Sequence, residues 1–415
     1  MCLPLWLPLL RRPCRRDRRD RQTDRHHPAE GADPMNLRDK LKAVSASGKP
    51  AAQPVKQFTD CWTRTENRPL ADFPHAFDVQ RETVMLMQGE DMPEGFDIRR
   101  VLFLDTETTG FMGAGTVAFL IGIGWLTDEG FTVRQYLMRD YPEEKFQLER
   151  LVDDLSRFDV ICTFNGRSFD VPLLRDRFLM NRMRASCLDK PHIDLLHIAR
   201  RVWKLRLKKC NLGRLEEAVL GICRVGDIPG AEVPQRFFSY LKTGRFSLLE
   251  DVIDHNAQDI ASLCVLLGHM AHMYDHPENA VHGEDVFSMG VALERMKHPE
   301  EARRCYRLAM RGPMRTQGQL RLAVNYRRCG DRAQAKEIWQ AMVIRHEGGA
   351  TPYIELAKHY EHVEKDLPAA LEMTRRALMH LAEPTLFDDE AVQETRNAVQ
   401  YRYDRLKSRL AKKEQ

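Results

Sequence analysis

The feature that most constrains the fold is an apolar run that ends in two acids. Residues 101–110 read VLFLDTETTG, so four apolar residues lead directly to Asp105 and Glu107. An apolar run of this length predicts a buried strand, and residues two apart on a strand point to the same face. Two like charges on such a strand repel each other unless a cation neutralises them. A strand end that enters solvent would explain this pair in isolation, whereas further acids along the chain favour a metal site.

A second short apolar strand leads to a third acid, Asp170. Residues 160–174 read VICTFNGRSFDVPLL, in which Asn165 predicts a break and a helix is expected to begin near Ser168. Asp170 then lies in a first helical turn. An acid at that position could also serve only as a charge partner of the helix dipole, worth roughly 0.3–1 kcal/mol.

The fourth acid, Asp259, is expected on a long helix. Residues 247–267 read SLLEDVIDHNAQDIASLCVLL, and their apolar positions recur at helical spacing. His255 and Asp259 are four residues apart and therefore share a face of this helix. Such a pair is often a surface contact, but its position beside an apolar stripe favours the edge of a packed cleft.

The order and spacing of these acids resemble the DEDD 3′–5′ exonucleases, the DnaQ-like group of the RNase-H-like superfamily. DTE at 105–107 is similar to their first motif, HNAQD at 255–259 to their third, and NGRSFDVP at 165–172 to the second motif of B-family DNA polymerase proofreading domains. Further stretches resemble the bacterial YprB-like group of predicted exonucleases with C-terminal repeats; they are residues 113–122, 209–213, 227–234 and 239–244.

The resemblance implies a nuclease that uses two divalent metal ions. Mg²⁺ and Mn²⁺ prefer carboxylate and water ligands, and two such ions about 3.5–4 Å apart can assist in-line displacement at a phosphodiester. By analogy with the family, Asp105 bridges the ions, Glu107 and Asp259 bind the ion on the nucleophile side, and Asp170 serves the ion on the leaving-group side, through water.

His255 departs from the pattern of the family. One subclass has a His with four residues before the last Asp, and another has a Tyr with three; His255 has the identity of the first and the spacing of the second. The resemblance implies that this side chain positions or deprotonates the attacking water, for which an ordinary imidazole pKa near ~6.5 is suited. The alternative is a histidine that only caps or packs beside the site.

Two other segments are interpreted as parts of the site. The resemblance implies that Thr108, Thr109 and Gly110 approach the terminal nucleotide through their backbone, which Gly permits. An ordinary strand-to-loop turn is the alternative for each. Asn165 is expected to contact substrate, unless it is only a turn residue. Asp194 ends another short apolar run and is either an accessory acid or a helix cap.

Basic residues gather after Asp194, although the chain as a whole, with 64 basic and 60 acidic side chains, is nearly balanced. The cluster consists of Arg200, Arg201, Lys204, Arg206, Lys208, Lys209 and Arg214, with Trp203 among them. The functional interpretation is a patch that follows phosphates, with a stacking ring and with Lys208 and Lys209 binding substrate. A solvated helix face is the alternative.

The N-terminal region is interpreted as lying outside the catalytic domain. Residues 1–10 are apolar and precede an Arg-rich stretch, the reverse of the order in a secretory signal, and they are too short to span a bilayer. We expect residues 1–34 to be a disordered arm or an over-extended reading frame, and 35–95 an extension or linker. No other apolar stretch could cross a membrane, and the ten Cys show no paired framework, which favours the cytoplasm.

The composition changes after residue 275 to Ala-, Arg- and Glu-rich helical segments. Ala302, Ala335 and Ala370 mark three similar segments, 33 and 35 residues apart. This spacing resembles tetratricopeptide repeats, whose period is near ~34 residues and whose stacked helices share a core. We predict such repeats over 280–382, which could bind a protein partner, and a tail at 383–415 with a capping helix.

The predicted fold is α/β over residues 96–272, followed by the all-α repeats. Strands are expected near 100–105, 117–125, 131–138 and 159–163, with a helix near 143–156. The resemblance implies a mixed five-stranded RNase-H-like sheet with flanking helices. The expected activity is 3′–5′ exonucleolytic hydrolysis from a single-stranded end of DNA or RNA. A structure-selective endonuclease and a non-catalytic adaptor are the alternatives.

Overall fold

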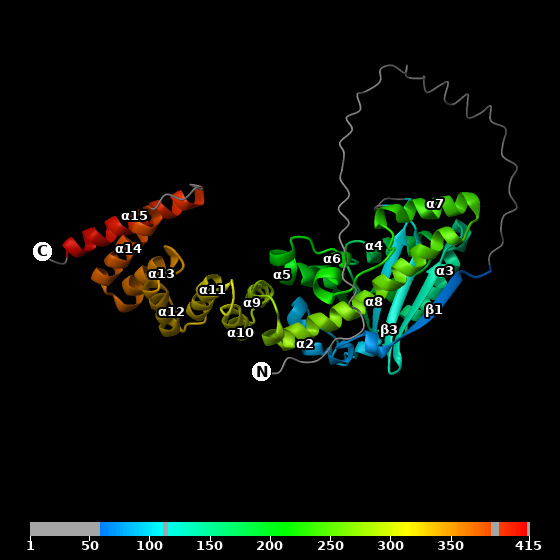
Figure 1. Ribbon diagram of the computed structural model, residues 1–415, viewed down its shortest axis with the longest axis horizontal. Coiled ribbons are helices and arrows are strands. Elements are labelled where there is room, and N and C mark those ends of the chain that lie inside the picture. The colour runs from blue at the N-terminus through cyan, green and yellow to red at the C-terminus, as the bar shows by residue number, and fades with distance from the viewer. Residues whose placement is uncertain (1–58, 111–114, 383–389, 413–415) are drawn as a thin grey trace, which may run out of the picture. The chain divides into compact units, whose positions relative to one another are not determined.

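A mixed sheet of six strands forms the centre of the N-terminal half (Figure 1), in the order β1-β4-β3-β2-β5-β6. The strands are β1 (Trp62–Pro69), β2 (Val101–Thr108), β3 (Ala118–Thr127), β4 (Gly130–Leu137), β5 (Val160–Thr163) and β6 (His192–Asp194). Strands β1 to β4 pair antiparallel, whereas β2, β5 and β6 run parallel. The computed structural model describes residues 59–110, 115–382 and 390–412, so the predicted arm at 1–34 lies outside the described residues. The α/β fold class is confirmed.

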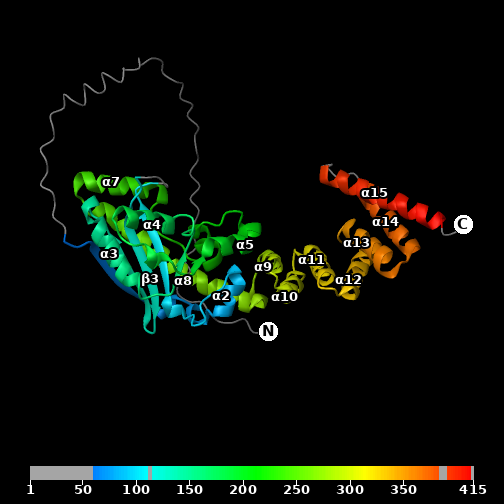
Figure 2. The same ribbon diagram turned by 180° about the vertical axis from the view of Figure 1, so that it is seen from behind.

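Helices cover both faces of this sheet (Figures 1 and 2). The helices of the N-terminal half are α2 (Arg81–Gln88), α3 (Glu144–Leu155), α4 (Asp170–Met180), α5 (Leu195–Leu207), α6 (Leu212–Leu215), α7 (Val233–Thr243) and α8 (Ser247–Asp275). Phe103 of β2 belongs to the core that contains α8, and Leu104 to the core that contains α3 and α4. Since side chains alternate along a strand, odd-numbered residues of β2 face α8 and even-numbered ones face α4.

The long helix α8 packs unusually close to β3. A Cβ added to Gly122 would lie 2.2 Å from Oδ1 of Asn256, and one added to Gly124 would lie 2.5 Å from Cγ2 of Ile260. Because real side-chain contacts are never that short, these two glycines permit the helix to approach the sheet. The close approach places the middle of α8 beside the end of β2, where the acids lie.

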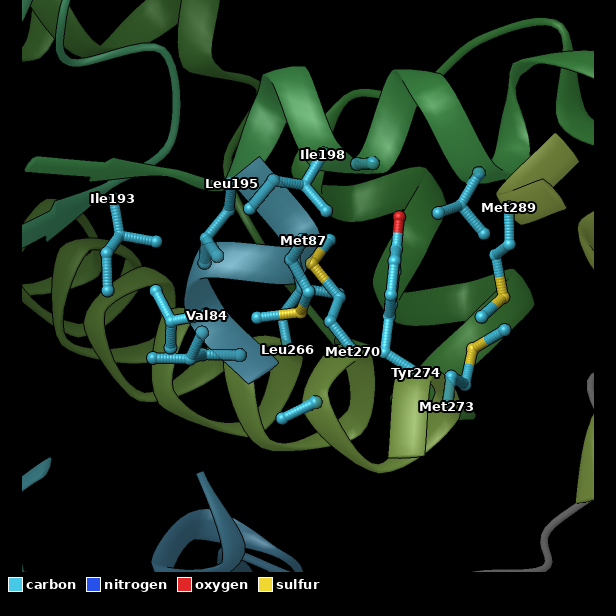
Figure 3. Packing of buried hydrophobic residues seen from close by; sticks show 14 of the residues in the cluster. Val84, Met87, Ile193, Leu195, Ile198, Leu266, Met270, Met273, Tyr274 and Met289 are labelled. Carbon is cyan, nitrogen blue, oxygen red and sulfur yellow. The ribbon is translucent and has the colours of Figure 1, made fainter. Parts of the chain in front are cut away.

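Residues 62–88 belong to the folded domain, although a linker was expected over 35–95. The sheet has six strands, although five were expected. Strand β1 pairs with β4 along its whole length, and Val84 and Met87 of α2 are buried against α8 (Figure 3). Strand β1 was not predicted because its sequence is polar and, as an exposed edge strand, it has no apolar run. Its residues Arg64 and Arg68 form ion pairs with Glu66. The sheet therefore gains a sixth strand at its edge.

The C-terminal region consists of helices, and short loops join those from α9 to α14. They are α9 (Gly283–Arg295), α10 (Pro299–Ala309), α11 (Arg315–Arg328), α12 (Arg332–Ile344), α13 (Thr351–His359), α14 (Leu367–Ala382) and α15 (Glu390–Ala411). The marker residues Ala302, Ala335 and Ala370 are fully buried, which permits close helix packing. The helical character is thus confirmed, whereas the tetratricopeptide assignment, its protein partner and the domain boundaries stay predictions. Within the described ranges no helix has the length and apolarity needed to cross a membrane.

The close approach of α8 to β3 generates a stability prediction. Gly124→Ala should lower the free energy of unfolding by about 1–3 kcal/mol, because the new methyl group would collide with Ile260 and Phe131. Urea denaturation of the purified protein measures this change. The matched control is Gly213→Ala in α6, where nothing lies within 4 Å of an added Cβ and where Ala should be neutral or stabilising by up to about 1 kcal/mol. Equal stability of Gly124→Ala and the parent would contradict the packing argument.

Candidate metal centre

Four acids from three segments meet at one edge of the sheet. Asp105 and Glu107 lie near the end of β2, Asp170 opens α4, and Asp259 lies on α8. Oγ1 of Thr106, on the opposite face of β2, donates a 2.6 Å hydrogen bond to Oδ1 of Asp170. The charges of Asp259, Asp170 and Glu107 all act on the carboxylate of Asp105, so the four acids share one neighbourhood, whereas their assignment as site residues stays a prediction.

Little solvent reaches these carboxylates. Asp170 is 4% exposed, and the side chains of Glu107 and Asp259 are 13% and 17% exposed. Burial, reinforced by the negative charges of Asp259, Asp170 and Glu107, raises the pKa of Asp105 well above its ordinary value. Burial likewise raises the pKa of Glu107 to about 7 and that of Asp170 to about 6. The site thus holds more negative charge than its surroundings compensate.

His255 presents one ring nitrogen to this cluster. Its Nδ1 lies 2.6 Å from Oδ1 of Asp227, while its Nε2 lies 3.6 Å from Oδ2 of Asp259 and 4.0 Å from Oε1 of Glu107. Burial opposes protonation, but the charge of Asp259 and the hydrogen bond to Asp227 outweigh it and raise the pKa of His255. One ligand atom each from Glu107, His255 and Asp259 lie within 4.8 Å of one another, so these three side chains could hold a cation.

Arg224 is a cation beside the acids that was not predicted from the sequence. Arg224 forms an ion pair with Asp259, a 2.5 Å ion pair with Glu216 and a 3.1 Å ion pair with Asp227. Glu216 is 1% exposed and also accepts a hydrogen bond from Ser262, so it anchors the guanidinium firmly. Asp227 opens one of the stretches that resemble the YprB-like group, which was the only sequence signal for this neighbourhood.

A buried amide pair, also missed, fixes Asp105. Nδ2 of Asn256 donates to Oδ2 of Asp105 at 3.0 Å, and Nε2 of Gln135 donates to Oδ1 of Asn256 at 2.9 Å. Nε2 of Gln135 also donates to the carbonyl of Ile253 at 2.7 Å. The available signal was Gln135 itself, a polar residue that lies between Arg134 and the apolar Tyr136 and Leu137 at the end of β4. Because both amides are buried, the chain of bonds holds the Asp105 carboxylate in one orientation.

The predicted backbone segment adjoins the acids. Thr108 and Thr109 follow Glu107 directly, after a shift in the β2–β3 register between Glu107 and Thr108. Oγ1 of Thr108 donates to the carbonyl of Gly110 at 2.8 Å, and the Thr109 amide donates to the carbonyl of Val117 at 3.0 Å. These bonds order the turn beside the carboxylates, and all three predicted residues are half-buried.

Asp194 acts as a cap and loop anchor. Its Oδ1 accepts bonds from the amides of Leu196 at 3.1 Å and Asn165 at 2.9 Å, and its Oδ2 from the amide of Arg167 at 3.2 Å. The left-handed backbone of Asn165, with φ of 72°, is held by this contact. Asp194 therefore shapes the loop that leads to Asp170, which favours the helix-cap alternative.

The basic cluster does not join the carboxylates as a whole. Lys208 and Lys209 are exposed and line a separate groove at the end of α5. The expectation that Trp203 is a stacking ring is wrong, because Trp203 is 1% exposed and packs against His269 of α8. The helical period of α5 turns Trp203 into the core while the neighbouring cations stay outside.

This chain is similar to the model of one protein superfamily and to known proteins. The RNase_H superfamily model matches residues 102–271. A Bacillus subtilis (strain 168) protein, the uncharacterized protein YprB, is 31% identical over 300 residues, which cover 70% of this chain and 71% of that protein. A solved structure of the family B DNA polymerase from the archaeon Pyrobaculum calidifontis is similar with a TM-score of 0.33 and 18% identity, over 50% of this chain and 31% of the polymerase. The chain spans less than a third of that polymerase.

Identity and coverage against YprB show that this chain belongs to the YprB family and carries an RNase_H superfamily domain.

Proposed function

We propose that this protein is a divalent-metal-dependent nuclease that hydrolyses phosphodiester bonds, and specifically a 3′–5′ exonuclease. The observation that carries the proposal is the meeting of Asp105, Glu107, Asp170 and Asp259 in a poorly solvated site with raised carboxylate pKa values. Folding alone does not favour such a cluster, whereas bound cations would neutralise it. The RNase_H superfamily membership supports a nuclease-type activity.

The residues present fit a pair of Mg²⁺ or Mn²⁺ ions. An all-carboxylate set with one imidazole at its edge is suited to hard cations, and no thiol lies among the site residues described above. Asp105 would hold both ions, Glu107 and Asp259 would serve the ion on the nucleophile side, and Asp170 the ion on the leaving-group side. When bound, the ions activate water and stabilise the departing oxygen.

The side chains around the acids have positioning roles in this proposal. His255, held at Nδ1 by Asp227, can accept a proton from water at Nε2. Asn256 orients Asp105, and Arg224 orients Asp259 while limiting the charge of the site before cations bind. Thr108, Thr109 and Gly110 are assigned to the terminal nucleotide, and Asn165 is assigned to the substrate. A protein partner of the C-terminal helices and a cytoplasmic location remain part of the proposal.

The test is degradation of 5′-labelled single-stranded DNA and RNA in Mn²⁺, Mg²⁺ or EDTA. A metal-dependent ladder of products that shorten from the 3′ end would support the exonuclease and would show whether it degrades DNA, RNA or both. Internal fragments from branched or hairpin substrates alone would favour the structure-selective endonuclease. Folded protein that cleaves none of these substrates would favour the adaptor.

Asp105→Asn and Asp259→Asn should each reduce cleavage by more than about a hundredfold, because loss of a ligand should exceed the 10–100-fold effect of losing an outer-sphere contact. The same end-labelled assay measures the loss, and circular dichroism checks the fold. Asp153→Asn, a substitution of an exposed acid on α3, is the control and should retain activity. Full activity of either site variant would refute the assignment.

The metal-free protein should lose stability as pH rises from about 4 to about 7. The folded pKa values of Glu107 and Asp170, about 7 and about 6, lie above their ordinary values of 4.5 and 3.8. Their protonated forms therefore favour the folded state at low pH, and that contribution disappears as pH passes the folded pKa values. In urea titrations with EDTA, Glu107→Gln should be stabilising at pH 8 and close to neutral at pH 4.

Mn²⁺ should restore the stability of the parent protein at pH 8 but have less effect on Glu107→Gln. Glu149→Gln, at an exposed position of α3, is the matched control: it should change stability equally at pH 4 and pH 8 and should keep the Mn²⁺ response of the parent. A Glu107→Gln effect that is the same at both pH values would contradict the raised pKa.

His255→Ala should slow turnover by about 10²–10⁴-fold while it changes metal affinity little, because Nε2 is assigned to proton transfer. Single-turnover cleavage and Mn²⁺ titration followed by electron paramagnetic resonance separate the two effects. His362→Ala, exposed near the end of α13, is the control. Weakened Mn²⁺ binding with unchanged turnover would make His255 a ligand or structural residue instead.

A further inference from the structure

A basic groove of about 860 Å³ lies between the end of α5 and the loop after β5. Its lining is Phe164, Asn165, Leu196, Arg200, Lys204, Lys208, Lys209, Cys210, Asn211 and Leu212. Every charged residue in this lining is basic. The groove also has apolar walls, because Leu196 is buried and Phe164 and Leu212 are half-buried. Such a combination fits a ligand with both anionic and flat apolar parts.

The cations of this region fall into two groups. Arg206 pairs with Asp285 at 2.7 Å, Arg214 pairs with Glu217 at 2.7 Å, and Arg201 donates to the carbonyl of Met87 at 3.1 Å. These three have structural partners. Within the part of the chain that the structure describes, the side chains of Arg200, Lys204 and Lys209 form no hydrogen bond or ion pair, and all three are exposed. These three cations all line the groove, together with Lys208, whose Nζ donates to the carbonyl of Leu205 at 2.9 Å.

Their spacing is unfavourable for the helix alone. Arg200 and Lys204 lie four residues apart on α5 and share a face of this helix, and Lys208 follows at the C-terminal cap, where its backbone is left-handed with φ of 64°. Like charges at this spacing destabilise a helix by about 0.2–0.5 kcal/mol per pair. The row is about 12 Å long, which corresponds to roughly three to four phosphates at the 3.4 Å spacing of a stacked strand. A polyanion would offset the repulsion.

The groove connects with the carboxylates through one loop. Phe164 and Asn165 form its wall, and the same loop continues to Asp170 at the start of α4. Asp194 fixes this loop by accepting bonds from the amides of Asn165 and Arg167. The half-buried ring of Phe164 offers a stacking surface for a base whose face is exposed, as in a single strand.

We propose that this groove binds the sugar-phosphate backbone of a single strand whose end occupies the carboxylate site. The proposal rests on the proposed nuclease function and adds the substrate class. Arg200, Lys204 and Lys209 contact phosphates, and Phe164 stacks on a base. Duplex ends bind more weakly, because paired bases cannot reach Phe164.

Binding is tested first, in EDTA, where no metal-dependent cleavage occurs. Fluorescence anisotropy compares a labelled 12-nucleotide single strand with its duplex, for the parent and for a combined Arg200→Gln, Lys204→Gln, Lys209→Gln variant. The variant should bind the single strand at least tenfold more weakly, and its log–log salt slope should be smaller by about two, since each phosphate contact contributes ~0.7. The control combines Arg184→Gln, Lys242→Gln and Arg245→Gln, which are exposed cations outside the groove.

Hydrolysis then separates this proposal from the nuclease function. The p-nitrophenyl ester of thymidine 5′-monophosphate is too short to reach the groove, so the groove variant should hydrolyse it as the parent does in Mn²⁺. The same variant should show a raised KM for the 12-nucleotide strand. Phe164→Leu should weaken single-strand binding severalfold without changing the salt slope, because it removes stacking and leaves the charges.

Two results would overturn the groove proposal. One is that the groove variant shows the same affinity for the single strand, and the same KM, as the parent. The other is that its affinity for the duplex and for poly-glutamate, a polyanion without bases, falls as much as its affinity for the single strand. If the parent cleaves neither the ester nor the strand while the binding differences remain, the nuclease function fails and the groove stands as a nucleic-acid site. If cleavage is normal and binding is unaffected by the substitutions, the groove proposal fails and the nuclease function stands.

Discussion

Mutual repulsion among the carboxylates at the end of β2 is the constraint on which the site depends. Asp105, Glu107, Asp170 and Asp259 lie where little water can screen them, and burial raises the pKa of each. The surrounding groups limit this cost in separate ways: Asn256 binds Asp105, Thr106 binds Asp170 and Arg224 pairs with Asp259. What these contacts leave uncompensated is the negative charge that a divalent cation would neutralise.

The sheet and the long helix bring these groups together through simple geometry. Alternation along β2 sends Asp105 and Glu107 toward α8 and Thr106 toward Asp170 of α4. Gly122 and Gly124 let α8 approach β3, so that Asn256 reaches Asp105 and His255 reaches Glu107. Larger residues at either glycine would lift the helix and separate acids that lie on different segments. The same packing that forms the core therefore determines the spacing of the site.

The positions of the acids could be predicted because each one is marked by a local sequence pattern. These patterns are the end of a strand, the start of a helix and the face of a helix. Arg224, Glu216 and Asn256 were not, since their roles depend on residues 35 or more positions away or on burial that no local pattern reports. Edge strand β1 was not predicted for a related reason: its residues are largely polar and exposed, so its sequence contains no apolar run. The error at Trp203 arose because a basic cluster does not reveal which side of α5 is buried.

We propose that the four carboxylates are ligands of a pair of hard divalent cations. Anomalous diffraction from crystals soaked in Mn²⁺ tests it most directly. We predict two peaks about 3.5–4 Å apart, both within ligand distance of Asp105, with Glu107 and Asp259 on one ion and Asp170 near the other. Soaked crystals of fully folded protein with no manganese peak at these residues, or with manganese bound only elsewhere, would contradict the account.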